Sequence, residues 1–221
     1  FFSRGMLIGT GTLPVTMIVG GLLSGLSFLQ IVLQSLPVLL FCFLLMFGIW
    51  RFPEQTVRAF TVFADVIRLL TTIGLIAGAF CYMTGFSLLP DLAPLEDAMA
   101  VVSSIGIVLL GSLPTVLKKP LSFIGRKTGM NDSSAAGLLM GIVSPVPAIT
   151  MMEKMDERGK IVNAAFLVSA ASTIAAHMGF TFGTDPDFVV PLLVAKLAGG
   201  IAAVCAALFF TKKSAYSKTR K

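Results

Sequence analysis

Residues 188–211 of the chain read FVVPLLVAKLAGGIAAVCAALFFT, an apolar run with a single charged side chain, Lys196. A helix of this length measures about 36 Å, which is enough to cross the ~30 Å hydrocarbon core of a bilayer. Similar runs recur through the 221 residues, of which 56% are hydrophobic and 13% charged. Soluble domains carry about 25% charged residues and disordered chains are poor in apolar ones. The composition therefore argues against both classes and predicts an integral membrane protein.

The apolar runs predict an all-α fold, a polytopic membrane helix bundle over residues 1–211 that is followed by a basic cytoplasmic tail at 212–221. Only helices and closed barrels span lipid, and these runs lack the alternation of a barrel strand. Because the chain starts at Phe1 and almost directly with an apolar run, we expect a fragment or one half of a longer protein. We predict one Pro-broken segment and about six full spans, at residues 6–26, 28–50, 60–85, 98–117, 160–182 and 188–211.

The broken segment covers residues 133–152 and contains Ser144-Pro145-Val146-Pro147 in its middle. Proline lacks a backbone donor and disfavours a helical residue before it, so the helix should end near Ser144. Residues 133–143 reach about 16 Å, roughly half of the hydrocarbon core. Lys and Arg on both flanks favour a re-entrant segment that enters and leaves on the cytoplasmic face, with a simple Pro-kinked span as the alternative. The flanking basic residues are Lys118, Lys119, Arg126, Lys127, Lys154, Arg158 and Lys160.

Few polar side chains lie at membrane depth, and their cost makes them functional candidates. His177 and Lys196 lie on consecutive predicted spans, at similar depths of about 12 and 16 Å from the loop between them. If both face the bundle interior, they line one cavity together with the break at 144–147. The candidate substrate-binding residues are His177, Lys196, Asn163, Ser144 and Pro147.

Each polar residue also has a purely structural interpretation. Lys196 could extend along its flexible stem to the interface, and His177 could hydrogen-bond a neighbouring helix. Asn163 could serve the start of its helix. Asp65 and Arg68, spaced three apart, most simply pair with each other. No carboxylate or nucleophile is spaced beside His177, so we predict no enzyme, no catalytic residues and no metal site.

Three distinctive stretches occur after residue 150. They are Met155-Asp156-x-Arg158-Gly159-Lys160-x2-Asn163-x2-Phe166-x-Val168-Ser169-Ala170-Ala171, His177-x-Gly179-Phe180 and Lys196-Leu-x-Gly199-Gly200. These stretches resemble the ethanolamine-utilisation transporter family, the bacterial inner-membrane ethanolamine permeases, and the likeness covers the second half of that family's length. The resemblance implies a permease that moves ethanolamine across the inner membrane, with no cofactor and no nucleic acid. It also implies a missing N-terminal half or partner subunit.

Two positions depart from the family pattern. The acidic residue expected before His177 is replaced by Ala176, and two expected adjacent Asn are replaced by Ser144-Pro145. Ethanolamine is a cation at neutral pH, and a carboxylate would be its natural counter-charge. A divergent permease for another small polar solute is therefore one alternative, and a non-transporting membrane subunit or scaffold is another.

Overall fold

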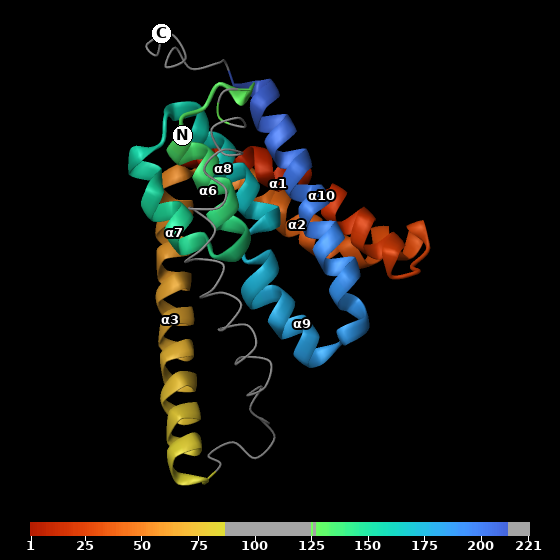
Figure 1. Cartoon of the computed structure of the whole chain (residues 1–221), viewed down its shortest axis with the longest axis vertical. Helices are drawn as coiled ribbons and strands as arrows, with labels where there is room; N and C mark the ends of the chain where they lie inside the picture. Colours follow the sequence, from red (N-terminus) through yellow and green to blue (C-terminus); the bar gives the residue numbers. More distant parts are fainter. Residues whose placement is uncertain (87–124, 126, 212–221) are drawn as a thin grey trace. The chain divides into compact units, whose positions relative to one another are not determined.

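The computed structural model describes residues 1–86, 125 and 127–211, and every element in these ranges is helical (Figure 1). The predicted all-α fold is confirmed for this part of the chain. The described helices are α1 (Phe2–Leu23), α2 (Phe28–Arg51), α3 (Pro53–Thr84), α6 (Asp132–Val143), α7 (Pro145–Thr150), the 3₁₀ turn η1 (Met151–Lys154), α8 (Glu157–Ala170), the π-helical turn η2 (Thr173–His177), α9 (Met178–Thr184), the 3₁₀ turn η3 (Pro186–Phe188) and α10 (Val189–Phe210).

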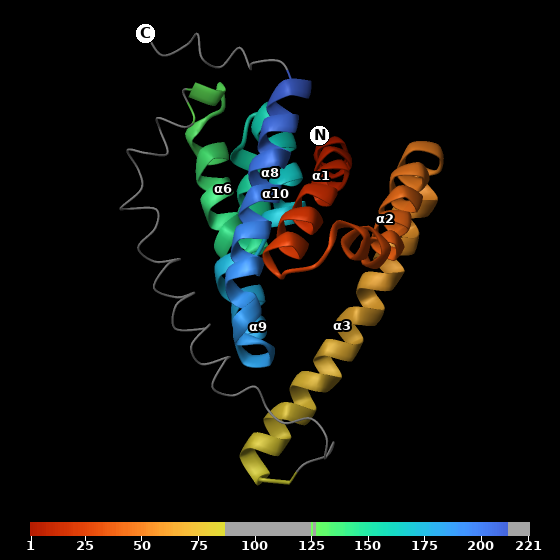
Figure 2. The same ribbon diagram turned by 90° about the vertical axis from the view of Figure 1, so that its right-hand side faces the viewer.

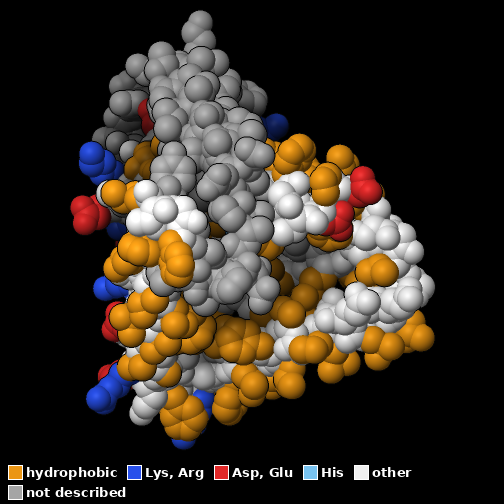
Figure 3. Space-filling view, turned by 90° about the horizontal axis from the view of Figure 1, so that it is seen from below, with side chains coloured by type: hydrophobic (Ala, Val, Ile, Leu, Met, Phe, Trp, Pro, Cys, Tyr) orange, Lys and Arg blue, Asp and Glu red, His pale blue; other side chains and the backbone are white. Residues whose placement is uncertain are grey.

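Four described stretches are long and apolar enough to cross a membrane. They are Phe2–Leu23, Phe28–Arg51, Glu157–Thr184 and Pro186–Phe210. The count of six spans is not confirmed, because residues 98–117 lie outside the described residues and the span predicted at 60–85 falls in α3, which is not among the four. Hydrophobic side chains cover much of the described surface that Figure 3 draws. Such a surface suits contact with lipid.

The chain divides into two compact units, and the larger contains the described residues of 1–42 and 97–221. In this larger unit α1, α8 and α10 pack against one another (Figure 2). Glycine makes the close approach of α1 and α8 possible: a Cβ at Gly9 would lie 2.5 Å from the Ala165 carbonyl oxygen and 2.7 Å from Val168 Cγ2. Small residues at helix interfaces are the usual way in which membrane helices pack without a hydrophobic driving force.

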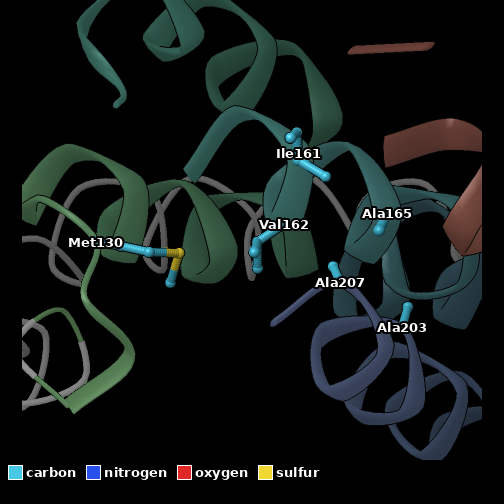
Figure 4. Close-up of a cluster of buried hydrophobic side chains, with 6 residues drawn as sticks. All are labelled: Met130, Ile161, Val162, Ala165, Ala203 and Ala207. Carbon is cyan, nitrogen blue, oxygen red and sulfur yellow. The ribbon is translucent and has the colours of Figure 1, made fainter. Parts of the chain in front are cut away.

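A buried cluster joins α8, α10 and the segment before α6 (Figure 4). Ala203 and Ala207, one turn apart on α10, let its backbone approach α8 closely. The branched side chains of Ile161 and Val162 belong to the same cluster and come from α8. The cluster consists of Met130, Ile161, Val162, Ala165, Ala203 and Ala207.

The smaller unit, Phe43–Glu96, contains the end of α2 and the whole of α3. Gly48 of α2 lies opposite Thr56 of α3, where a Cβ would be 2.8 Å from the threonine Oγ1. Asp65 and Arg68 form an exposed ion pair with an O–N distance of 3.7 Å. The interpretation that these two charges pair with each other is therefore confirmed.

The predicted broken segment is a helical hairpin. The helix α6 ends at Val143, the next residue, Ser144, has an extended backbone (φ −152°, ψ 135°), and α7 and η1 then return beside α6. The two ends of the hairpin are joined: Asn131 N–H donates to Asp156 Oδ1 at 3.1 Å, and Asn131 Nδ2 donates to the Lys154 carbonyl at 2.8 Å. A hairpin with meeting ends has the shape that a re-entrant segment requires.

The span predicted at 160–182 falls within the described stretch Glu157–Thr184, which is long and apolar enough to cross a membrane, but its helix is interrupted. The helix α8 ends at Ala170, and Ser172 adopts a left-handed conformation (φ 54°, ψ 26°). The π-helical turn η2 and then α9 follow. Neither Pro nor Gly lies at this second break, so the local sequence does not predict it.

Candidate functional site

The first helix break leaves a carbonyl without its helical donor. In a continuous helix the N–H of residue 145 would donate to the Gly141 carbonyl, but Pro145 has no N–H. Pro147 likewise cannot donate to the Val143 carbonyl. Two backbone acceptors near Ser144 are thereby released from the helix ladder.

The second helix break supplies the donor that the first one lacks. The Ser172 N–H donates to the Gly141 carbonyl at 3.0 Å, so the two breaks are joined by a backbone hydrogen bond. This bond diverts the Ser172 N–H from Val168, the residue four positions earlier in α8. The Val168 carbonyl therefore loses its regular helical donor, and non-helical backbone from two segments meets inside the larger unit.

His177 ends the π-helical turn that follows the second break. Its backbone N–H donates to the Ser172 carbonyl at 3.1 Å, and its Nδ1 lies 3.0 Å from the Ala171 carbonyl oxygen. A carbonyl only accepts, so this contact places the proton on Nδ1 and leaves Nε2 as an acceptor in the neutral ring. The ring is exposed in the described structure.

Lys196 lies on the helix that packs beside His177. The turn η2, which ends at His177, contacts both α6 and α10, and Lys196 is a half-buried residue of α10. Ser144 directly follows α6 and is half-buried. Ser144 and Lys196 thus belong to or directly follow the two helices that contact η2, and Pro147 lies in α7 just beyond the first break.

Asn163 is not part of this group. It is fully buried, and its Nδ2 donates to the Ser134 carbonyl at 2.8 Å and to the Gly159 carbonyl at 2.9 Å. Ser172 follows it nine positions later in the chain, which corresponds to about 13 Å along a helix. Its side chain joins the start of α8 to α6.

A polar network that the sequence did not reveal lies at the end of the larger unit where α6 and α8 begin. Asp156 Oδ1 accepts from Ser134 Oγ at 2.7 Å. Arg158 is buried, and its Nη2 donates to the Leu208 carbonyl at 2.9 Å; Arg4 Nη2 donates to the Phe210 carbonyl at 2.7 Å. Both guanidinium groups thus satisfy carbonyls at the C-terminal end of α10, where a positive charge also complements the helix dipole.

Within the described ranges, no group of three or more His, Cys, Asp and Glu side chains could hold a metal ion. The site is instead made of backbone carbonyls, one imidazole, one ammonium and a hydroxyl. Such groups can bind a small solute that carries both hydrogen-bond donors and acceptors.

The model of the family described as "Ethanolamine utilisation protein, EutH" matches residues 1–210. A relative from Listeria monocytogenes, named "Probable ethanolamine permease EutH", is 36% identical over 219 residues, which cover 96% of this chain and 59% of the relative. Relatives of the same name from Escherichia coli and Salmonella typhimurium are 32% and 33% identical, covering 100% and 96% of this chain and 61% and 59% of their own lengths.

The chain therefore spans about three-fifths of the length of these curated relatives. No solved structure matches it.

Proposed function

The chain belongs to the family of ethanolamine utilisation proteins named EutH, and we propose that it takes part in moving ethanolamine across a bacterial inner membrane as a permease. The names of the relatives support a membrane permease, and the four apolar stretches suit a multi-pass membrane protein. We also propose that the solute binds where the two helix breaks meet.

The hydrogen bond between Ser172 N–H and the Gly141 carbonyl is the observation that carries this proposal. Discontinuous helices in transporters bind solutes and ions with unwound backbone groups near the midplane. The first break leaves the Val143 carbonyl without its helical donor, and this oxygen can accept a hydrogen bond from an ammonium group. The Nε2 atom of a neutral His177 accepts from a hydroxyl, so the two ends of ethanolamine find different partners.

The two departures from the family pattern bear on how the cation is recognised. Ala176 is exposed next to His177, and no carboxylate stands at this position. In our proposal, carbonyl oxygen therefore binds the ammonium group in place of a carboxylate. Lys196 repels a cationic solute at close range, so its role in our proposal is to speed the release of the solute.

We further propose that the hairpin of α6, α7 and η1 is re-entrant from the cytoplasmic side. The basic residues Arg4, Lys154, Arg158 and Lys160 lie at or near the end where α10 terminates. Asp185 and Asp187 lie at the opposite end of α10, before its first residue. The bias of Lys and Arg toward cytoplasmic loops supports a cytoplasmic basic end.

The test is uptake of labelled ethanolamine into proteoliposomes that contain the purified protein. We expect flux above that of empty vesicles, and a loss of roughly two- to tenfold in both His177→Ala and Lys196→Ala, the range expected for one hydrogen bond or charge contact. Lys154→Ala is the matched control, because Lys154 is exposed and outside the site, and it should keep wild-type flux. Wild-type flux in both site variants would remove His177 and Lys196 from the pathway.

Ala176 gives weight to a second candidate, a permease for another small polar solute. Competition of the same uptake by neutral amino alcohols and small polyols separates the two. Stronger competition by a neutral solute than by ethanolamine would favour the second candidate. Background flux for every solute, with correctly inserted protein, would favour a non-transporting subunit.

A further inference from the structure

Two hydroxyl groups inside the larger unit have no hydrogen-bond partner among the residues that the structure describes. They are Thr16 Oγ1 on α1 and Ser169 Oγ on α8, and both atoms are buried; Ser169 is only 2% exposed. Thr12, one turn before Thr16 on the same helix, donates normally to the Gly9 carbonyl at 2.8 Å. An unpaired hydroxyl in an apolar interior is unfavourable, so two of them at one place call for a ligand.

Both side chains lie against the backbone of α10 at Gly199. A Cβ at Gly199 would collide with Thr16 Oγ1 and would lie 3.1 Å from Ser169 Cβ. Three helices, α1, α8 and α10, therefore converge here around a position that has no side chain of its own. Any residue other than glycine at 199 would have to displace the Thr16 hydroxyl.

A third oxygen, the Val168 carbonyl, lies next to Ser169 near the C-terminal end of α8. The Val168 carbonyl has lost its helical donor because the Ser172 N–H is bound to Gly141. Ser169 is the next residue and α8 ends at Ala170. The C-terminal end of a helix carries partial negative charge from its unpaired carbonyls, which attracts a cation.

We propose that Thr16 Oγ1, Ser169 Oγ and the Val168 carbonyl are ligands of a sodium ion. All three are neutral oxygen donors, which suit a hard cation. The described carboxylates of the larger unit lie near its two ends and not in the middle of these helices, so the site lacks the negative charge that divalent ions usually require. The C-terminal ends of half-helices hold Na⁺ in other transporters by the same physics.

Lys196, one turn before Gly199 on α10, makes the site weak. Like charges repel, so a bound Na⁺ and the charge of the Lys196 ammonium disfavour each other. The sodium site adjoins the second helix break through Ser169 and Val168. Occupation of the site thus biases the arrangement of the break at which the solute is proposed to bind.

The experiment measures the melting temperature of the purified full chain in detergent with no solute present. NaCl replaces choline chloride at constant ionic strength, and KCl serves as a second comparison. Ligand that binds only the folded state raises its stability, so Na⁺ at about ten times its Kd should raise the melting temperature by about 3–6 °C, in a saturable way. KCl should give less than half of this rise.

The variants identify the ligands. Thr16→Val and Ser169→Ala should each abolish the rise caused by Na⁺, whereas the matched control Thr12→Val should keep it. Lys196→Met should shift the midpoint of the Na⁺ titration to lower concentration. No rise in the wild-type protein, or an equal rise in Thr16→Val and Ser169→Ala, would overturn the proposal. Because no solute is used, the sodium site can fail without any consequence for the proposed transport of ethanolamine.

Discussion

Asn163 shows how a polar residue at membrane depth can serve the fold and not the solute. Its two amide hydrogens satisfy the carbonyls of Ser134 and Gly159, and the side chain is fully buried. By contrast, His177 is exposed and Lys196 is half-buried. Burial therefore distinguishes Asn163, whose amide nitrogen joins two helices, from His177 and Lys196, which a ligand can reach.

This difference predicts the behaviour of Asn163→Ala. The substitution leaves two carbonyls with one donor fewer, at a cost of about 1–3 kcal/mol for each group left without a partner. We expect the melting temperature in detergent to fall by about 5–10 °C. The exposed residue Gln34 provides the control, and Gln34→Ala should melt within about 1 °C of wild type.

One result would contradict the structural role of Asn163. A variant with unchanged melting temperature but lost uptake would show that the amide contacts the solute or its path. The structural role assigned to Asn163 would then be wrong.

At the scale of elements, the two broken helices depend on each other. Pro145 removes the donor that Gly141 would receive from its own helix, and Ser172 supplies a donor from another helix. A break in a membrane helix normally exposes unsatisfied backbone groups, which are costly in lipid. Here part of that cost disappears because the two breaks meet.

Replacement of Pro145 by alanine should disturb this pairing. Residue 145 regains an N–H that can reach the Gly141 carbonyl, and alanine favours the helix by about 3 kcal/mol over proline in a helix interior. We expect uptake to fall at least about tenfold while membrane insertion and yield are retained, since the competing backbone bond shifts the site. The measurement is initial uptake in proteoliposomes at matched protein content.

Pro37→Ala is the matched control for this experiment. Pro37 lies inside the unbroken helix α2. Its replacement should leave uptake within about twofold of wild type. Equal uptake in Pro145→Ala and wild type would show that the pairing of the breaks does not matter for transport.

At the scale of the whole molecule, the charges of the larger unit separate along α10. Arg4 and Arg158 donate to carbonyls at its C-terminal end, and Asp187 precedes its first turn. The hairpin returns to the level of Asn131 through its bond with Asp156. Both hairpin flanks are therefore expected on the side of the basic end.

Cysteine labelling tests this topology in intact cells and inverted vesicles. After replacement of Cys42, Cys81 and Cys205 by serine, Lys127→Cys and Glu157→Cys should both react with a membrane-impermeant maleimide only in inverted vesicles. Asp187→Cys should react only in intact cells. Reaction of residues 127 and 157 from opposite sides would show that the hairpin segment crosses the membrane, and the re-entrant proposal would fall.

The local pattern of residues was sufficient for much of the architecture. Apolar runs of about 20 residues predict spanning helices because lipid leaves the backbone no other partner than itself. The break at Ser144 was also predictable, because Pro145 removes a donor wherever it stands. The same holds for the ion pair of Asp65 and Arg68, whose spacing alone brings them together.

The tertiary structure decided the rest, because the partners are distant in sequence. The break at Ser172 carries no Pro or Gly; it exists where the Gly141 carbonyl offers an acceptor from another helix. The burial of Asn163 depends on the Ser134 carbonyl in α6, and the unpaired hydroxyls of Thr16 and Ser169 meet only because Gly199 lets three helices converge. Hydrogen bonds and close approaches between helices depend on which faces meet, and no periodicity within one helix specifies that.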